Sequence, residues 1–185
     1  MTHNTAFLFS GQGSQYNEMG KDLYYNYDIA KKTYDYAEDI LNYKIKSISF
    51  ESNNELLNET KYPQPAIFIY NYIAHKILGS SGIVPNVVAG HSLGEYNALV
   101  AASVINFETA LQLVQQRADK MYEVGKSTPG KMAAILNYNL KSINDIIENY
   151  KSIVIANINS YKQIILSGST CEMNDLLENF KKFNI

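Results

Sequence analysis

Apolar and polar residues follow one another along the chain in blocks whose spacing predicts helices and strands. Residues 6–9 form a short apolar run that ends at a glycine-rich loop over residues 10–15, which predicts a buried strand in the middle of a sheet. Residues 18–43 are polar, with apolar or aromatic residues at roughly helical spacing, which predicts helices packed through one face. A helix opened by a proline near its first turn is predicted over residues 66–78.

The middle of the chain contains a strand, a tight turn and a helix in immediate succession. A short apolar run leads into Gly-His-Ser-Leu-Gly at residues 90–94, the Gly-x-Ser-x-Gly pattern of a nucleophile elbow. Only glycine fits two residues before and after the serine in such a turn, so we expect Ser92 to be strained, exposed and directed at a substrate. The backbone N–H of Leu93, at the start of the following helix, is the expected oxyanion donor. The alternative is that Ser92 only caps a buried helix.

The second half of the chain predicts one long helix and then a smaller lobe. The helix covers residues 107–124 and carries Arg117 beside its apolar stripe, where the charge needs a partner. The clearest loop signal, at residues 125–130, divides the chain into lobes of residues 1–126 and 127–185. Strands are then predicted over residues 132–136, 153–158 and 163–166, and helices over residues 140–150 and 171–183. This β-α-β-β-α order is a ferredoxin-like unit without its last strand.

Composition places the chain among globular proteins and narrows the choice of partners. It has 185 residues and 46% apolar content, with 16 basic and 18 acidic side chains mixed along the sequence. Because no basic cluster could neutralise a phosphate backbone, nucleic acid is not expected as a partner. No apolar run is long enough to span a membrane and the N-terminus does not resemble a signal peptide, so we expect a cytoplasmic protein without membrane contacts.

Cysteine and histidine usage argues against disulfide and metal chemistry. Cys171 is the only cysteine, which excludes an internal disulfide. His3, His75 and His91 have no partner at ligand spacing, so no metal site is expected. The loop at residues 10–15 lacks the third glycine of a dinucleotide fingerprint and no phosphate-binding loop motif occurs, so no nucleotide cofactor is expected either.

Acyl transfer by a serine also requires a base that takes the serine proton. His91 adjoins Ser92, but adjacent residues on a sharp turn point in different directions. His75 is expected to be a surface or half-buried residue of its helix, and His3 lies in a terminus that is expected to fray. The pattern of residues therefore leaves the base unidentified.

Six segments together resemble the malonyl-CoA:acyl carrier protein transacylases, in order and in spacing across the chain. They are Phe-Ser-Gly-Gln-Gly-Ser-Gln at residues 9–15, Gln-Pro-Ala at 64–66, Gly-His-Ser-Leu-Gly-Glu-Tyr at 90–96, Arg117, Gly-Lys-Met-Ala-Ala at 130–134 and Ala-Asn-Ile-Asn at 156–159. The same pattern marks acyltransferase domains of polyketide and fatty acid synthases. The resemblance implies an α/β fold with an α/β-hydrolase-like parallel-sheet lobe and a ferredoxin-like small lobe, and we expect both to be incomplete.

The resemblance also implies roles for individual residues. Ser92 would be acylated, and Gln12 with the Leu93 N–H would form the oxyanion hole. Arg117 would pair with the malonyl carboxylate, a task that suits a planar guanidinium because it donates two parallel, charge-assisted hydrogen bonds. Gln64 would shape the pocket.

Further residues match or depart from the family's pocket. His91 would line the site without acting as the base, and Met132, Asn157 and Asn159 would belong to the substrate-binding region. Ser10 stands where a proline is usual. The resemblance implies no cofactor: malonyl-CoA is a substrate, and the phosphopantetheine is carried by the acyl carrier protein, the implied partner.

The implied function is the transfer of a malonyl group from coenzyme A, through a serine ester, to the phosphopantetheine thiol of an acyl carrier protein. Family members are longer than this chain and carry their catalytic histidine after the small lobe, so we expect the 185 residues alone to be inactive. Two alternatives stay open: a serine hydrolase or editing acyl hydrolase, and a non-catalytic fragment that docks a carrier protein. Fatty acid and polyketide synthesis fit the pattern equally well.

Overall fold

A computed structural model describes residues 4–51 and 55–183, which fall into two compact units. The first unit, Met1–Glu123, contains a parallel sheet with its helices, and the second, Val124–Ile185, contains an antiparallel sheet with its helices. The division between the units falls inside the helix that carries Arg117, three residues before the boundary that the sequence predicts.

The first unit is mostly helical around a short parallel sheet. Its elements are β1 (Ala6–Phe9), α1 (Lys21–Asn26), α2 (Asp28–Leu41), α3 (Ile45–Phe50), the 3-10 helix η1 (Glu55–Asn58), α4 (Pro63–Ser80), β2 (Val87–Gly90), α5 (Gly94–Ala101) and α6 (Phe107–Ser127). Helix α4 begins three residues earlier than predicted, because a proline at the first helical position loses no hydrogen bond. None of the helices in the described residues is both long and apolar enough to cross a membrane.

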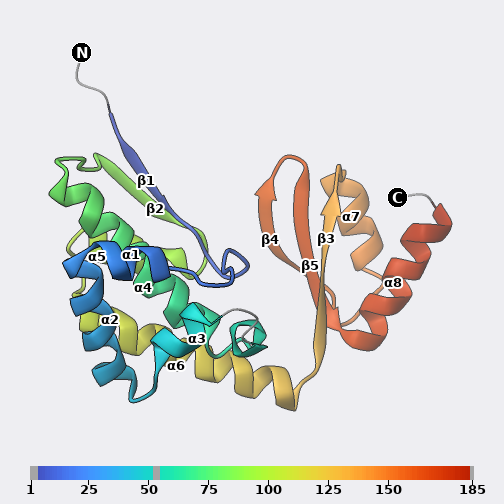
Figure 1. Cartoon of the computed structure of the whole chain (residues 1–185). Helices are drawn as coiled ribbons and strands as arrows, with labels where there is room; N and C mark the ends of the chain where they lie inside the picture. Colours follow the sequence, from blue (N-terminus) through green and yellow to red (C-terminus); the bar gives the residue numbers. More distant parts are fainter. Residues whose placement is uncertain (1–3, 52–54, 184–185) are drawn as a thin grey trace. The chain divides into compact units, whose positions relative to one another are not determined.

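Helix α4 forms the centre of the first core. Its side chains Ile67, Phe68 and Ile73 are at most 1% exposed, and the helix packs against α2 and α5. Helix α5 in turn packs on both strands of the parallel sheet, β1 and β2, which lie side by side in Figure 1. The pairing runs from Ala6 opposite Val87 to the last residue of each strand. The end of each strand therefore lies close to the start of α5.

The prediction of a buried strand in the middle of a sheet is wrong for β1 as the structure describes it. Within residues 4–51 and 55–183, β1 pairs only with β2, and Leu8 is 79% exposed. Parallel strands usually have both faces covered, but here α5 packs on one face while Leu8 and Val87 stay exposed. An apolar run indicates that a strand can be buried. It does not show whether other elements of the chain cover that strand.

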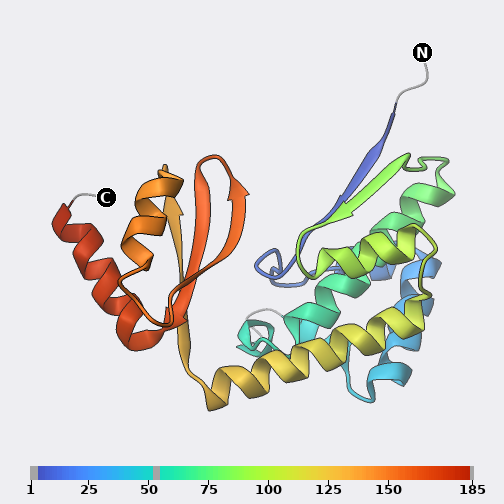
Figure 2. The same ribbon diagram turned by 180° about the vertical axis from the view of Figure 1, so that it is seen from behind.

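The second unit has the predicted β-α-β-β-α order. Its elements are β3 (Gly130–Leu136), α7 (Leu140–Ile147), β4 (Val154–Ser160), β5 (Gln163–Ser169) and α8 (Thr170–Phe183). The strand order is β3-β5-β4 with antiparallel pairing throughout. The two helices lie on one face of this sheet (Figures 1 and 2) and cover a core that includes Ile164, Leu166 and Met173. The arrangement is that of a ferredoxin-like fold through its second helix.

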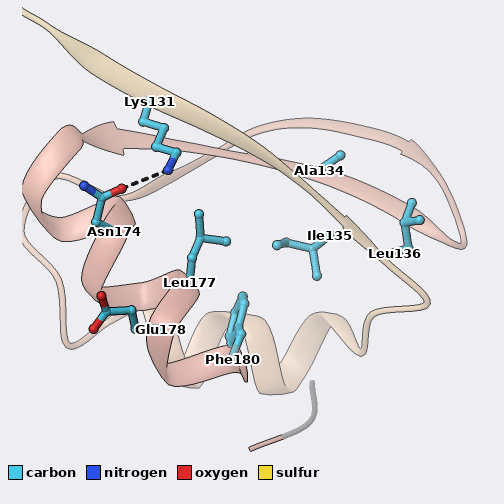
Figure 3. A pocket seen from close by; sticks show the side chains of 8 residues that line it. All are labelled: Lys131, Ala134, Ile135, Leu136, Asn174, Leu177, Glu178 and Phe180. Carbon is cyan, nitrogen blue, oxygen red and sulfur yellow. Dashed lines mark hydrogen bonds between the residues drawn. The ribbon is translucent and has the colours of Figure 1, made fainter. Parts of the chain in front are cut away.

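A groove of about 570 Å³ lies along the outer edge of β3. Figure 3 shows its lining: Ile135 from the strand faces Leu177 and Phe180 from α8, and the Lys131 Nζ donates to the Oδ1 of Asn174 at 2.8 Å. Among the described residues this edge of β3 has no strand partner. A complete β-α-β-β-α-β unit has its last strand at this edge, which accounts for the apolar lining.

Candidate active site

The turn that carries Ser92 joins the end of β2 to the start of α5. Gly90 pairs with Phe9 in the parallel sheet, and the His91 N–H donates to the Phe9 carbonyl oxygen at 3.0 Å. Ser92 then has a φ of 53°, a left-handed conformation that costs energy for any residue with a Cβ. Its side chain is exposed, whereas Leu93 is fully buried. The turn therefore holds the serine hydroxyl outside the core, in the geometry of a nucleophile elbow.

Glycines make this turn possible because the backbone of the turn lies very close to the backbone of α5 on one side and of β1 and the glycine-rich loop on the other. A Cβ on Gly90 would lie 2.0 Å from the carbonyl carbon of Gly94, and a Cβ on Gly94 would lie 2.2 Å from the Phe9 carbonyl oxygen. The glycine-rich loop meets the turn in the same way, since a Cβ on Gly11 would lie 2.4 Å from the His91 carbonyl oxygen. Side chains at these positions would separate the loop from the turn.

The N-terminus of α5 leaves a backbone donor next to the serine. The helix begins at Gly94, and Leu93 precedes it as the N-cap residue in helical conformation. The Leu93 N–H donates no hydrogen bond within the described part of the chain, as is usual for the first N–H groups of a helix. The positive end of the helix dipole favours a negative charge at this point. This donor is thus available to a ligand oxygen.

Arg117 reaches the serine hydroxyl from α6. Its Nη2 donates to the Ser92 Oγ at 2.9 Å, and its Nη1 donates to the Oε1 of Gln64. The Nε2 of Gln64 donates in turn to the Oε1 of Gln12 at 3.2 Å. A continuous chain of side-chain hydrogen bonds therefore joins four residues that the sequence singles out.

Gln64 is the centre of this chain and is fully buried. It lies in the first turn of α4, directly after Pro63. Its amide oxygen accepts from Arg117, while its amide nitrogen faces the Gln12 Oε1 and the Sδ of Met121, at 3.2 and 3.3 Å. Because buried polar atoms need hydrogen-bond partners, this set of partners fixes the orientation of the amide. The fixed amide then holds the guanidinium in place.

The charge of Arg117 is not balanced by a carboxylate in the described residues. Its acceptors Gln64 and Ser92 are neutral, and the ion pairs within residues 4–51 and 55–183 do not include it. Asp119, also on α6, pairs with Lys61 at 3.6 Å instead. A guanidinium that keeps its positive charge beside an exposed serine is suited to bind a carboxylate through two hydrogen bonds.

Comparison with known proteins identifies the family. The family profile described as an acyl transferase domain matches residues 6–185. The chain belongs to this family. The malonyl CoA-acyl carrier protein transacylase of Bacillus subtilis (strain 168) is 41% identical to this acyl transferase domain over 168 residues, which are 89% of this chain and 53% of the relative. The chain thus spans about half the length of that relative.

Solved structures share the fold of this acyl transferase domain. The crystal structure of the Synechocystis sp. PCC 6803 malonyl-CoA:ACP transacylase has a TM-score of 0.88 at 37% identity, and the match covers 96% of this chain and 59% of that one. A type II polyketide synthase acyl carrier protein in complex with its malonyl-transacylase has a TM-score of 0.83 at 30% identity, with 93% and 57% covered. The resemblance drawn from the six sequence segments and the α/β fold that it implies are confirmed.

Three predicted substrate-binding residues lie in the second unit of the acyl transferase domain. Met132 is on β3 with 58% of its surface exposed, and Asn157 and Asn159 are exposed on β4. The Nδ2 of Asn159 donates to the Oε1 of Gln163 at 2.9 Å, which links β4 to β5. Their part in substrate binding stays a prediction.

A base for Ser92 is not identified among residues 4–51 and 55–183. His91 is exposed, and its Nδ1 lies 3.5 Å from the position of a Cβ on Gly11, so its ring lies over the loop backbone. His3 lies outside the described residues. The partner of the serine hydroxyl is Arg117, which only donates hydrogen bonds and cannot take a proton.

His75 packs against β1, the first strand. It is half-buried on α4, and its ring meets those of Phe7 and Phe9 edge-on, with centroids 5.7 and 6.2 Å apart. Its Nδ1 is buried without a hydrogen-bond partner in the described residues. Burial, and to a smaller degree the charge of Lys76, lowers the pKa of His75. These contacts are those of a packing residue.

Sequence reasoning missed Met121 as a part of the site. Its sulfur is a contact of the Gln64 amide at 3.3 Å. Met121 follows Arg117 by four residues on α6, so both side chains lie on the same face of the helix. That spacing is the sequence signal that could have identified Met121 as part of the site.

The described residues contain no group of three or more histidine, cysteine, aspartate or glutamate side chains that could hold a metal ion.

Proposed function

We propose that this protein transfers a malonyl group from coenzyme A to an acyl carrier protein, with Ser92 as the nucleophile. The observation that carries the proposal is the hydrogen bond from the charged Arg117 to the Ser92 Oγ, at 2.9 Å. In the described residues the other hydrogen-bond partner of this guanidinium, Gln64, is also neutral, so the positive charge is not balanced. A positive charge beside the nucleophile favours an acyl group that itself carries a negative charge. The similarity to transacylases supports the same substrate class.

The reaction has two balanced steps. In the first, the Ser92 oxygen attacks the thioester carbonyl carbon, a C–O bond forms, the C–S bond breaks and coenzyme A leaves as a thiol with the serine proton. In the second, the phosphopantetheine thiol of the carrier attacks the ester carbonyl carbon, a C–S bond forms, the ester C–O bond breaks, and the thiol proton passes to the serine oxygen, which leaves as the free hydroxyl. In both steps the carbonyl oxygen becomes negative, and the Leu93 N–H with Gln12 would stabilise it.

Arg117 would change partners during the first step. In the free site one of its N–H groups is hydrogen-bonded to the Ser92 Oγ. Once that oxygen is part of an ester, the malonyl carboxylate, one methylene away from the carbonyl, would accept from the guanidinium instead. Gln64 holds the other side of the guanidinium, so the arginine needs little reorganisation to bind the carboxylate.

Labelled malonyl-CoA tests the proposal in the full-length protein. We expect a covalent adduct that Ser92→Ala abolishes and that holo-acyl carrier protein discharges as malonyl thioester. Label retained in Ser92→Ala would refute the assignment of the nucleophile. Release of free malonate faster than carrier acylation would favour an acyl hydrolase, and carrier binding without any adduct would favour a docking module.

Arg117 variants test the choice of the acyl group. Arg117→Ala should lower kcat/KM for malonyl-CoA by roughly 10- to 150-fold, because a charge-assisted interaction worth about 1.5 to 3 kcal/mol is lost. Acetyl-CoA, which has no carboxylate, should lose no activity. Arg117→Lys is the matched control: it keeps the charge, but it cannot donate to Gln64 and a carboxylate with the same planar geometry. An equal loss for both substrates would show that Arg117 does not read the carboxylate.

Residues 1–185 by themselves should acylate the carrier several orders of magnitude more slowly than a serine acyltransferase that has a positioned base. The described residues offer the nucleophile, an oxyanion donor and a carboxylate partner, but not an identified base. Rapid carrier acylation by residues 1–185 would contradict this expectation.

A further inference from the structure

A buried polar cluster lies directly beneath the glycine-rich loop. Asn71 on α4 is 9% exposed and Asn97 on α5 is 2% exposed. The Nδ2 of Asn71 donates to the Ser10 carbonyl oxygen at 3.1 Å and to the Oδ1 of Asn97 at 3.3 Å. The Nδ2 of Asn97 donates to the Phe68 carbonyl oxygen at 2.9 Å. One amide side chain thus links the loop to both helices.

Ser10 is where the chain leaves the sheet, and its carbonyl needs a new partner there. The Phe9 carbonyl is still bonded to the His91 N–H of the elbow, whereas the next carbonyl accepts from Asn71. The Ser10 hydroxyl lies 3.0 Å from that of Ser14, at the far side of the same loop. Asn71 therefore fixes the first backbone group of the loop, two residues before Gln12.

The same cluster connects to the elbow from the other side. Asn97 lies one turn into α5, the helix that begins directly after the Ser92 turn. The first residue of that helix, Gly94, is so close to the loop that a Cβ on it would lie 2.8 Å from the Ser10 carbonyl oxygen. The oxygen that Asn71 binds is thus the one against which the elbow helix packs.

We propose that Asn71 is a positioning residue for acyl transfer: by binding the Ser10 carbonyl and Asn97 together, it sets the distance between the Gln12 loop and the Ser92 elbow. This rests on the proposed function, in which Gln12 and the Leu93 N–H stabilise the oxyanion. Asn71 itself touches no reacting atom. Its loss leaves the serine and the guanidinium in place and displaces one wall of the oxyanion site.

The test compares Asn71→Leu with the double variant Asn71→Leu, Asn97→Leu in the full-length protein. Asn71→Leu leaves the buried side-chain amide of Asn97 without its hydrogen-bond donor, so it should lower both the stability of the protein and its kcat. The double variant removes both amides, which relieves the unpaired polar group and should restore much of the thermal stability. In both variants we expect kcat for malonyl transfer to fall roughly 10- to 100-fold with KM within about twofold, because misplacement of about 1 Å has effects of this size.

Thr33→Val is the matched control for a lost buried hydrogen bond in the same unit. Thr33 on α2 is 6% exposed and donates to the Ile29 carbonyl oxygen at 2.7 Å. This variant should lose stability and keep kcat. If kcat recovers together with stability in the double variant, or is unchanged in both variants, the positioning role is overturned. If Asn71→Leu does not fold, the double variant decides alone.

Amide hydrogen exchange gives a readout that does not depend on catalysis. We expect exchange at residues 11–15 to be at least about tenfold faster in both Asn71 variants and unchanged in Thr33→Val, because the loop opens locally once its anchor is lost. Unchanged exchange would overturn the proposal even if activity falls. If the wild-type protein transfers no malonyl group, the proposed function fails, and exchange still decides whether Asn71 holds the loop.

Discussion

Gly94→Ala is the sharpest test of how the elbow is built. The added Cβ would lie 2.2 Å from the Phe9 carbonyl oxygen, whereas ordinary contacts begin at 3.4 Å. The end of β1 or the start of α5 must therefore move by roughly 1 Å, and both are backbone elements that cannot rotate away as a side chain could. Overpacking of this kind costs about 1 to 3 kcal/mol, which lowers the melting temperature by roughly 4 to 12 °C for a unit of this size.

The displacement separates the two sides of the proposed oxyanion site, so acylation of Ser92 should slow in addition to the loss of stability. Single-turnover labelling of Ser92 by malonyl-CoA in the full-length protein should slow by about 100-fold, the effect expected of a 1 Å misplacement. Thermal unfolding followed by circular dichroism measures the stability of the same samples.

Gly79→Ala is the matched control, because this glycine lies in α4 and a Cβ on it would meet nothing within 4 Å. It should be neutral or stabilising by about 0.4 to 1 kcal/mol, since alanine favours the helix, and its labelling rate should equal that of the wild type. If Gly94→Ala labels as fast as Gly79→Ala, the close backbone contact does not control the reactivity of Ser92, and the reasoning is refuted.

Further predictions concern stability and its pH dependence. Because the folded state lowers the pKa of His75, wild-type stability should fall as the pH drops below its ordinary 6.5, and urea unfolding of His75→Phe should not show this fall. Glu172 accepts from the Ser152 N–H and hydroxyl at 2.8 and 2.7 Å, which lowers the pKa of the carboxyl. Glu172→Gln should therefore destabilise the second unit at neutral pH, and the difference should vanish as the pH falls below 4.5 and through the lowered pKa. Leu166→Ala, at a fully buried position of β5, should destabilise the second unit by about 2 to 5 kcal/mol in urea unfolding.

Each of these has an outcome that contradicts it. For His75, the same slope of stability against pH in the phenylalanine variant would place the titrating group elsewhere. For Glu172, a difference from glutamine that does not shrink at all as the pH falls below 4.5 and through the lowered pKa would exclude the carboxylate as its source. For Leu166, a free energy of unfolding within about 0.5 kcal/mol of the wild-type value would show that this side chain does not stabilise the core of the second unit.

The order of elements followed from the sequence because its local signals agree with the fold. The apolar run before Gly90, the prolines in the first turn of α4 and the loop after α6 each mark an element boundary that the structure contains. Helix α3 was not predicted, since its six residues are too few for a helical period to stand out. The exposure of Leu8 could not be predicted either, because burial depends on neighbours far along the chain.

The site was predictable where a residue has a distinctive chemistry, and not where its role comes from contacts. Ser92 and Arg117 stand out as a serine in a glycine-bounded turn and as a charge beside an apolar stripe. Asn71 does not stand out, because an asparagine within a helix gives no sign that it meets a loop carbonyl 61 residues away. The burial of Gln64 is likewise a property of the packed structure.

The unbalanced guanidinium of Arg117 also affects how quickly ligands arrive. A carboxylate neighbour would have cancelled its field, but its described partners Gln64 and Ser92 carry no charge. The positive potential of the Arg117 guanidinium beside Ser92 therefore extends into the solvent and attracts anions before they make contact. Added salt screens this attraction over about 10 Å at 0.1 M. Capture of an anionic thioester should accordingly slow as ionic strength rises, while the rate of the bond-making steps that follow stays the same.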